Sequence, residues 1–242
     1  MRPDDFGPAG DVPAEVAAIP IPAWLETDMA EKGLDAAWRE VVRRLYRASQ
    51  WRIRLRMRQT GATSLQALLD MDAARERDEA LREAGIPPLL LEQASGKLDI
   101  TDAMAWAQLM AEVGVERGQC LVLCGPTGVG KSTAAAWLAR ELVAQGYRPR
   151  WEYAPEMFAR LHMGDIQHHP ITVAPVLIID DLGAEDEPRA RAKIDTVVYY
   201  RHAARRPTVI TTNLRPEALA ERYGSRVVDR LQEWGPVVQV VA

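Results

Sequence analysis

One run of nine residues limits the folds open to this chain more than any other feature. Residues 125–133 read Gly-Pro-Thr-Gly-Val-Gly-Lys-Ser-Thr, which is the pattern Gly-x-x-x-x-Gly-Lys followed by Ser or Thr. The apolar run Cys120–Cys124 comes before them, and an alanine-rich segment with helical spacing, Ser132–Ala144, comes after. A buried strand, a glycine-rich turn and a helix in this order predict a phosphate-binding loop, or P-loop.

The residue types in this loop match what a nucleoside triphosphate requires. Glycines let the backbone curl so that successive N–H groups and the helix N-terminus point at the phosphates. We expect Lys131 to reach the β- and γ-phosphates, Ser132 to bind Mg²⁺ and Thr133 to contact the α-phosphate region. A chance glycine-rich turn would lack the flanking strand and helix. The predicted nucleotide-binding residues are Gly125, Pro126, Thr127, Gly128, Val129, Gly130, Lys131, Ser132 and Thr133.

Two carboxylates follow a second apolar run. Val176–Ile179 predicts a strand buried on both faces, and Asp180 and Asp181 come directly after it. Burying unpaired charge is costly, so two acids at the end of an interior strand indicate a use for them, although a turn or a helix cap is the alternative. If this strand lies beside the P-loop strand, Asp180 would hold Mg²⁺ and Asp181 would orient or deprotonate the attacking water.

Polar residues also end a third apolar run, Pro207–Thr211. An amide at this position, Asn213, could hydrogen-bond both the attacking water and the γ-phosphate, but an asparagine in an ordinary turn has the same pattern. Further along, Arg226 and Arg230 are four residues apart and so share one face of a short helix. Either could be offered to the γ-phosphate of a neighbouring subunit, or both could be exposed arginines paired with Glu221 or Asp229.

The order of elements predicts an α/β fold. From residue 99 onward, five short apolar strands alternate with helices, which favours a mostly parallel sheet between helical layers. Residues 31–98 have helical spacing, with one helix from about Glu31 and another over Ser64–Ala84. The alternation of apolar and basic residues in Trp51–Arg58 would suit a strand, but no helix breaker interrupts the segment, so we predict a continued helix. Residues 1–30 are predicted to be an extended or disordered lead-in.

Charge, apolar runs and cysteine content indicate where in the cell the protein is expected to be found. The net charge is −4, yet eight arginines and one acid lie between Arg39 and Arg58, so this stretch carries +7. No run of eighteen apolar residues and no secretory signal is present, which predicts a protein that does not span a membrane. Cys120 and Cys124 would lie roughly 13 Å apart on a strand, too far for a disulfide. We therefore expect a reducing, cytoplasmic location.

Taken in order, these motifs resemble one branch of the AAA+ ATPases. The P-loop is followed by Ile-Asp-Asp-Leu-Gly-Ala-Glu185, Tyr-Tyr-Arg201, Thr-Thr-Asn213-Leu and Gly-Ser-Arg226-Val-Val-Asp-Arg230-Leu. This combination is similar to the DnaC/IstB type, which comprises bacterial and phage helicase loaders and transposition helpers. The resemblance covers about residues 85–242. It implies ATP and Mg²⁺ as cofactors, Asn213 as a sensor of the γ-phosphate, and an ATP-dependent homo-oligomer in which Arg230, with Arg226 second, completes the adjacent site.

Some features depart from the usual AAA+ pattern. Asp181 stands where glutamate is more frequent, and its shorter reach would slow hydrolysis. The sequence ends just after the last predicted strand, so the resemblance implies that the C-terminal helical lid of most AAA+ proteins is missing. The resemblance also implies that single-stranded DNA runs along the ring interior, past a predicted loop that carries His162, His168 and His169.

Three functions are compatible with the sequence. The first is an ATP-hydrolysing DNA-replication accessory protein that loads a replicative helicase, with residues 31–98 as the helicase-docking domain. The second is a transposition helper ATPase that binds a transposase in the same way. The third is a small-molecule P-loop kinase, although no arginine-rich lid is evident. The basic stretch Arg39–Arg58 could instead contact DNA phosphates.

Overall fold

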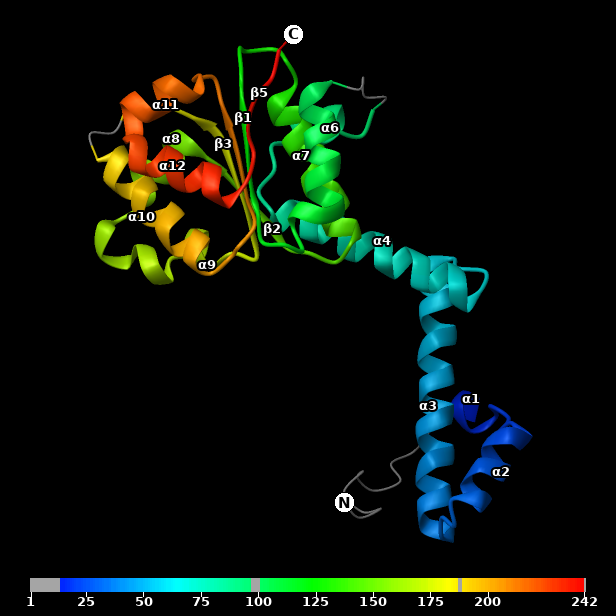
Figure 1. Ribbon diagram of the computed structural model, residues 1–242. Coiled ribbons are helices and arrows are strands. Elements are labelled where there is room, and N and C mark those ends of the chain that lie inside the picture. Colours follow the sequence, from blue (N-terminus) through cyan, green and yellow to red (C-terminus); the bar gives the residue numbers. More distant parts are fainter. Residues whose placement is uncertain (1–13, 97–100, 187–188, 242) are drawn as a thin grey trace. The chain divides into compact units, whose positions relative to one another are not determined.

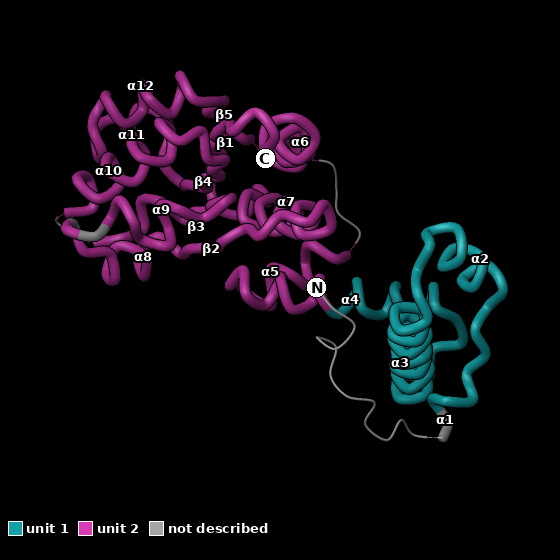
Figure 2. Tube along the Cα trace, turned by 90° about the horizontal axis from the view of Figure 1, so that it is seen from below, with its two compact units in different colours: residues 1–75 teal, residues 76–242 magenta. Residues whose placement is uncertain are grey.

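The protein divides into two compact units. A computed structural model describes residues 14–96, 101–186 and 189–241 (Figure 1). Residues 1–75 form the first unit and residues 76–242 the second (Figure 2). The sequence predicted a boundary between residues 98 and 99, which lies outside the described residues. The observed division comes earlier because Ala84, Ile86 and Ala94 are buried in the core of the second unit.

The first unit is helical. It contains α1 (Ala14–Ala17), α2 (Ala23–Glu31), α3 (Ala36–Thr60) and the beginning of α4 (Leu65–Glu83). Helices therefore replace much of the extended lead-in that we predicted through residue 30, while residues 1–13 of that lead-in lie outside the described residues. The physical reason is visible in α2, where Leu25 and Met29, one helical turn apart, are both buried.

The basic stretch lies on α3 and is helical, as predicted. Asp35 caps the helix by accepting a hydrogen bond from the Trp38 amide at 2.8 Å, and Gly61 ends it in a left-handed conformation, with φ of 72°. In a helix, residues two apart point about 200° from each other, so the alternation in Trp51–Arg58 places apolar side chains on two opposite sides. These apolar side chains are half-buried and the arginines between them are exposed.

Arginines tie the first unit together. Arg43 donates to both carboxylate oxygens of Glu26, at 2.7 and 2.8 Å, and so joins α3 to α2. Arg47 donates to the Ile19 carbonyl at 3.1 Å. At the other end of α3, Arg56 donates to Asp72 on α4 at 2.5 Å. Part of the basic stretch therefore serves packing inside the unit.

The second unit is built on one parallel sheet. Its strands are β1 (Cys120–Cys124), β2 (Pro149–Tyr153), β3 (Val176–Leu182), β4 (Thr208–Thr212) and β5 (Val237–Gln239). Their order across the sheet is β2-β3-β4-β1-β5, and each neighbouring pair is parallel. This confirms the predicted five-stranded α/β fold. One expectation was wrong: β3 does not lie beside β1, because β4 is inserted between them.

Helices cover both faces of this sheet (Figure 1). One face packs against α5 (Pro88–Gln93), α6 (Asp102–Leu109), its π-helical continuation η2 (Met110–Gly114) and α7 (Lys131–Ala144). The other packs against α8 (Ala154–Arg160), the 3-10 helix η3 (Met163–His168), α9 (Pro170–Val173), α10 (Ala190–Ala203), α11 (Pro216–Tyr223) and α12 (Ser225–Trp234). In the described part of the chain, no helix combines the length and apolar character needed to cross a bilayer.

The segment predicted as a histidine-bearing loop is helical instead. His168 ends η3, and His169 precedes α9 and accepts a hydrogen bond from the Ile171 amide at 3.3 Å. Ile166 and Ile171 are buried in the core, and their burial holds this connection against the sheet.

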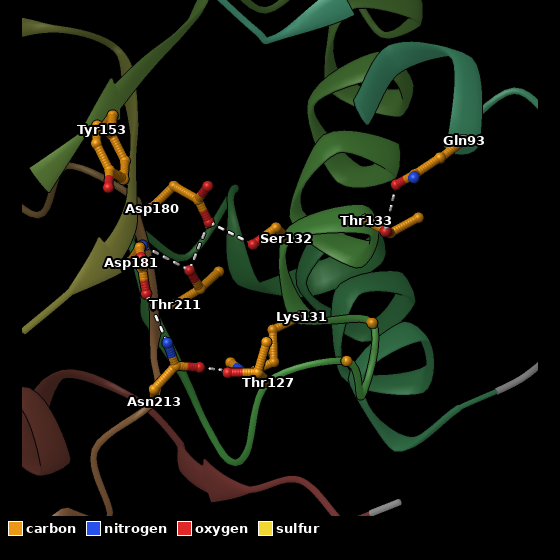
Figure 3. Close-up of a pocket in the computed structure, with 12 residues that line it drawn as sticks. Gln93, Thr127, Lys131, Ser132, Thr133, Tyr153, Asp180, Asp181, Thr211 and Asn213 are labelled. Carbon is orange, nitrogen blue, oxygen red and sulfur yellow. Dashed lines mark hydrogen bonds between the residues drawn. The ribbon is translucent and has the colours of Figure 1, made fainter. Parts of the chain in front are cut away.

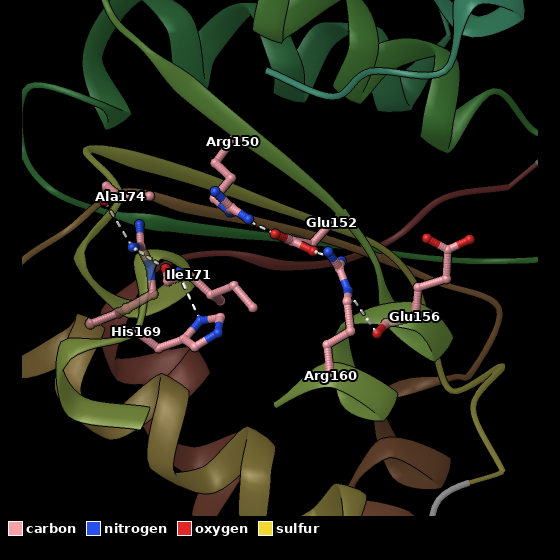
Figure 4. A network of polar contacts seen from close by, with 8 residues as sticks. Arg150, Glu152, Glu156, Arg160, His169, Ile171 and Ala174 are labelled. Carbon is pink, nitrogen blue, oxygen red and sulfur yellow. Dashed lines mark hydrogen bonds and ion pairs between the residues drawn. The ribbon is translucent and has the colours of Figure 1, made fainter. Parts of the chain in front are cut away.

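A buried carboxylate joins β2 to α8. Glu152 is 2% exposed and lies between two arginines, as Figure 4 shows. Arg150 Nε and Arg160 Nη2 donate to its two oxygens, each at 2.6 Å. Because both oxygens are paired with a guanidinium, the cost of burying this charge is offset.

The two cysteines of β1 are free and fully buried. Burial raises the pKa of the Cys124 thiol to about 11 and raises that of Cys120 as well. The prediction that they form no disulfide with each other is confirmed.

Candidate nucleotide-binding site

The P-loop connects a buried strand to the helix that follows it. β1 is buried throughout, and α7 begins at Lys131 with Gly130 as its N-cap, which has no side chain to cap the first amides. Gly125, Gly128 and Gly130 have φ angles of 156°, 88° and 85°, a region that glycine enters without strain. A Cβ on Gly125 would lie 2.4 Å from the Val240 carbonyl oxygen, so glycine is required there for space as well.

These residues frame a cavity of about 630 Å³ at the carboxyl end of the sheet (Figure 3). Six of the nine predicted loop residues line it: Thr127, Gly128, Gly130, Lys131, Ser132 and Thr133. The other three have supporting positions. Gly125 and Pro126 direct their carbonyls at Lys131, and Val129 packs against the core on the α7 side of the sheet.

Lys131 is the residue on which several contacts converge. Its ammonium donates to the carbonyls of Gly125 at 2.9 Å and Pro126 at 2.7 Å, and to Asn213 Oδ1 at 3.0 Å. The side chain is 6% exposed. Burial lowers the pKa of Lys131, while the charges of Asp181 and Asp180 act in the opposite direction.

Ser132 and Asp180 meet on the other side of the cavity. Ser132 Oγ donates to Asp180 Oδ1 at 2.7 Å, and Thr211 Oγ1 donates to the same oxygen at 2.6 Å (Figure 3). A hydroxyl beside a carboxylate at the mouth of a phosphate-binding loop is a set of hard oxygen donors, which Mg²⁺ prefers. The residues present therefore fit a magnesium ion.

Asp181 lies in a distorted part of β3. The predicted strand ended at Ile179, but β3 continues to Leu182, and its pairing with β4 shifts between Ile179 and Leu182. Asp181 has φ of 59°, and its amide donates to Thr211 Oγ1 at 2.9 Å. Burial raises the pKa of Asp181, and the neighbouring Asp180 carboxylate raises it further.

Asn213 connects the lysine to this aspartate. Its Oδ1 accepts from Lys131, and its Nδ2 donates to Asp181 Oδ1 at 2.8 Å. Asn213, directly after β4, therefore lies between Lys131, at the start of α7, and Asp181, near the end of β3. The insertion of β4 between those strands is what allows the contact.

The sequence analysis missed three residues that line the cavity: Gln93, Tyr153 and Thr211. Thr211 bridges Asp180 and the Asp181 amide, and its place at a polar strand end was a usable signal. Gln93 comes from α5 and accepts a hydrogen bond from Thr133 at 3.3 Å. Tyr153 ends β2, where it pairs in register with Asp180. The local sequence around Gln93 and Tyr153 has no motif that would single them out.

The two candidate arginines do not reach this cavity. Arg226 and Arg230 lie on α12 and pair with Asp195 on α10. In the described part of the chain, neither arginine forms an ion pair with Glu221 or Asp229, the alternative partners that the sequence suggested. Within one copy of the protein, therefore, the arginines and the P-loop belong to separate sites.

Comparison with known proteins identifies the family. Residues 73–240, well over half of the chain, match the family described as IstB-like ATP binding protein. The chain belongs to this family. This confirms the resemblance seen in the motifs, and ATP binding is the property that the family's description states.

Two curated relatives have related descriptions. The replicative helicase loader DnaI of Bacillus subtilis is 27% identical over 169 residues, which are 63% of this chain and 54% of DnaI. The putative insertion sequence ATP-binding protein y4pL of Sinorhizobium fredii is 28% identical over 171 residues, which are 66% of this chain and 68% of that protein. The chain thus spans little more than half the length of DnaI.

Solved structures confirm the AAA+ type of P-loop fold. A crystal structure of DnaI matches with a TM-score of 0.53 at 26% identity, covering 64% of this chain and 94% of that one. Domain III of the Thermotoga maritima replication initiation protein DnaA matches with a TM-score of 0.53 at 18% identity, covering 64% of this chain and 68% of that one. At that identity the likeness to DnaA concerns the fold alone.

Proposed function

We propose that this IstB-like protein hydrolyses ATP in an assembly of several copies and serves as a loader of a replicative helicase. The observation that carries the hydrolysis is the line of contacts from Lys131 through Asn213 to Asp181, beside the Ser132–Asp180 pair. One cavity thus contains a cation for the phosphates, oxygen ligands for a metal and a carboxylate that can accept a proton.

Each residue then has a role in phosphoryl transfer. The P-loop amides and Lys131 bind the triphosphate, and Ser132 and Asp180 would hold Mg²⁺, which neutralises charge on the phosphates when bound. Asn213 orients a water molecule, and Asp181 accepts its proton as the water oxygen bonds to the γ-phosphorus. The bond to the β–γ bridging oxygen breaks, and ADP leaves with the electron pair.

We further propose that Arg226 and Arg230 act on the ATP of a neighbouring copy. Neither arginine lines the cavity of its own chain, yet each presents a guanidinium on α12. A guanidinium supplied between copies would stabilise the charge that develops on the γ-phosphate, which makes hydrolysis depend on assembly.

The helicase-loading role draws on the relatives that this chain resembles. DnaI, a replicative helicase loader by its description, is both a curated relative and a structural match at more than 25% identity. The transposition helper remains the second candidate, because y4pL is described as an insertion sequence ATP-binding protein. Relatives in replication and transposition favour these two functions over the small-molecule kinase.

The first unit is the proposed docking unit for the helicase or transposase. It precedes most of the family match, which begins at residue 73. It also exposes large apolar side chains, with Trp24 63%, Leu69 51% and Leu65 49% exposed. Single-stranded DNA is the proposed ligand of the assembled second unit, which would stimulate hydrolysis.

The lysine variant tests the site. We expect Lys131→Ala to abolish binding of Mg·ATP, because it removes the ammonium that would pair with the phosphates and leaves the Gly125 and Pro126 carbonyls without this donor. Titration calorimetry on the folded variant and on wild type measures this. Tight ATP binding by Lys131→Ala would overturn the site assignment. Wild-type binding without phosphate release, with or without single-stranded DNA, would overturn the proposed hydrolysis.

A pull-down separates the two partner classes. The full chain is used as bait in a lysate of its own host with ATP present, and the same host's replicative helicase and transposases are sought by mass spectrometry. We expect the helicase to be recovered with wild type and to be reduced with Lys131→Ala. Recovery of a transposase in its place would transfer the assignment to the second candidate.

A further inference from the structure

A charged cluster on the α10–α12 side of the second unit contains the two arginines that are proposed to act between copies. α10 contributes Asp195 and Tyr199, which are four residues apart and so share a face. α12 contributes Arg226 and Arg230, again four residues apart. We call these four residues the Asp195 cluster. Its only carboxylate comes from a different helix than its arginines.

Asp195 divides its two oxygens between the arginines. Oδ2 accepts a hydrogen bond from Arg226 Nη2, and Oδ1 accepts one from Arg230 Nη1 at 3.1 Å. Arg230 has a second support, because its guanidinium carbon lies 5.3 Å from the centre of the Tyr199 ring. One carboxylate therefore fixes the separation of two guanidinium groups that would otherwise repel each other.

The two arginines differ in their freedom to move. The Arg226 side chain is 75% exposed, whereas the side chains of Arg230 and Asp195 are 21% and 20% exposed. Arg230 is thus held between a ring and a carboxylate, while Arg226 is held by the carboxylate and otherwise faces solvent. If Arg226 turned to an external anion, Arg230 would still neutralise Asp195, so no partly buried charge would be left unpaired.

The space beside the cluster is suited to an anion. A cavity of about 440 Å³ is lined by Asp195 and by three arginines, Arg189, Arg191 and Arg226. Gly224 admits Arg191 to this place, since a Cβ there would lie 2.5 Å from Arg191 Nη2. The guanidinium groups of Arg191 and Arg226 at this cavity would attract a ligand with several phosphate charges.

We propose that Asp195 is a positioning residue, which holds Arg226 and Arg230 in the arrangement in which they meet the ATP bound by a second copy of this chain. This inference depends on the proposed donation of an arginine between copies. Asp195 does not touch the nucleotide in this proposal. Its effect on hydrolysis passes through the two arginines.

Mixed assemblies of full-length chains test this directly. One variant, Lys131→Ala, keeps its arginines but cannot bind ATP. The other, Arg226→Ala with Arg230→Ala, binds ATP but offers no arginine. Each alone should be inactive, and their mixture should release phosphate only where an intact ATP site meets intact arginines. Asp195→Asn is then added to one variant at a time.

We expect Asp195→Asn to have an effect in only one of the two chains of the mixture. In the arginine-donating chain, Asp195→Asn should lower kcat of the mixture roughly threefold to tenfold, with the KM for ATP unchanged, because an oriented group is lost and binding is not. In the ATP-binding chain, Asp195→Asn should change neither kcat nor the KM for ATP. Asp195→Glu, which keeps the charge, should restore most of the activity. Asp229→Asn, which removes an exposed carboxylate from α12, the helix of the two arginines, is the matched control.

The remaining outcomes overturn the inference in distinguishable ways. An unchanged kcat with Asp195→Asn in the donating chain overturns the positioning role alone. An equal loss of kcat with Asp195→Asn in either chain indicates a defect of folding or packing, and this result overturns the positioning role as well. A mixture that stays inactive although the arginine-free chain binds ATP overturns both this inference and arginine donation, while ATP binding at the P-loop still stands.

Discussion

At the scale of single residues, the distortion at Asp181 decides what the end of β3 can do. In a regular strand, consecutive side chains point to opposite faces, so Asp180 and Asp181 could not share a cavity. Here both line it, because the pairing of β3 with β4 shifts and Asp181 takes a φ of 59°. That conformation costs roughly 1 kcal/mol for most residues, and aspartate is among those that tolerate it best.

Asp181→Asn isolates the proposed proton acceptor. Asparagine also tolerates a positive φ and fills the same space, so we expect the fold and the affinity for Mg·ATP to be retained. Hydrolysis should fall about 100-fold or more, because an amide cannot accept the proton from water. Phosphate release measures the rate of hydrolysis, and calorimetry measures the affinity for Mg·ATP. Wild-type turnover by Asp181→Asn would mean that another group activates the water.

At the scale of elements, one buried arginine joins α10 to the segments that enter the sheet. Arg201 is fully buried and donates to the carbonyls of Ile171, Ala174 and Pro207 at 3.1, 2.9 and 2.7 Å. It also donates to the Thr208 hydroxyl at 2.8 Å, where β4 begins. Burial lowers the pKa of Arg201 to about 9, which is still above neutral pH, so the guanidinium stays charged at pH 7.

Replacing this arginine should destabilise the second unit. Arg201→Met fills similar space but leaves several buried carbonyl oxygens without a donor, so we expect a loss of about 3 kcal/mol or more in the free energy of unfolding. Urea unfolding followed by circular dichroism measures it. Arg148→Met is the comparison, since Arg148 is 58% exposed and its ion pair with Glu83 should contribute at most about 1 kcal/mol. Equal losses in the two variants would refute the structural role of Arg201.

At the scale of the whole molecule, the proposed functions are divided between the two units. The second unit contains the entire candidate ATP site and the arginines of the Asp195 cluster. The first unit contains α3, whose second half has half-buried apolar residues on two sides and exposed arginines between them. A protein surface that carries apolar residues flanked by carboxylates would match it, and this favours protein docking over binding of DNA phosphates alone.

Charge reversal on α3 tests that division. We expect Arg52→Glu, Arg54→Glu and Arg58→Glu together to reduce capture of the helicase at least tenfold, because like charges would then face the partner. ATP binding should be unchanged, since the P-loop lies in the other unit. Reversal of Arg75 and Arg82, exposed residues of α4, is the matched control. If helicase capture persists and affinity for DNA is lost, α3 contacts nucleic acid and the docking assignment fails.

Much of the second unit could be predicted because the motifs that specify it consist of consecutive residues. The P-loop is contiguous, and β1 has the bounds of the apolar run Cys120–Cys124 that predicted it. The alternation in Trp51–Arg58 was ambiguous, and the absence of a breaker pointed correctly to a helix. Where local signals were weak, predictions failed: an extended or disordered lead-in was expected where α2 forms, and the residues before α9 were expected to be a loop.

The sequence by itself determined that a phosphate-binding loop, an acidic strand end and a polar strand end are present, since each is written in consecutive residues. Only the tertiary structure decided how they meet. Strand order is set by packing between distant segments, and it puts β4 between β1 and β3, so that Asn213 reaches Lys131 across 82 residues of sequence. The tertiary structure likewise pairs Arg226 and Arg230 of α12 with Asp195 of α10. Sequence spacing could not show this pairing, because proximity in a fold depends on packing between distant segments.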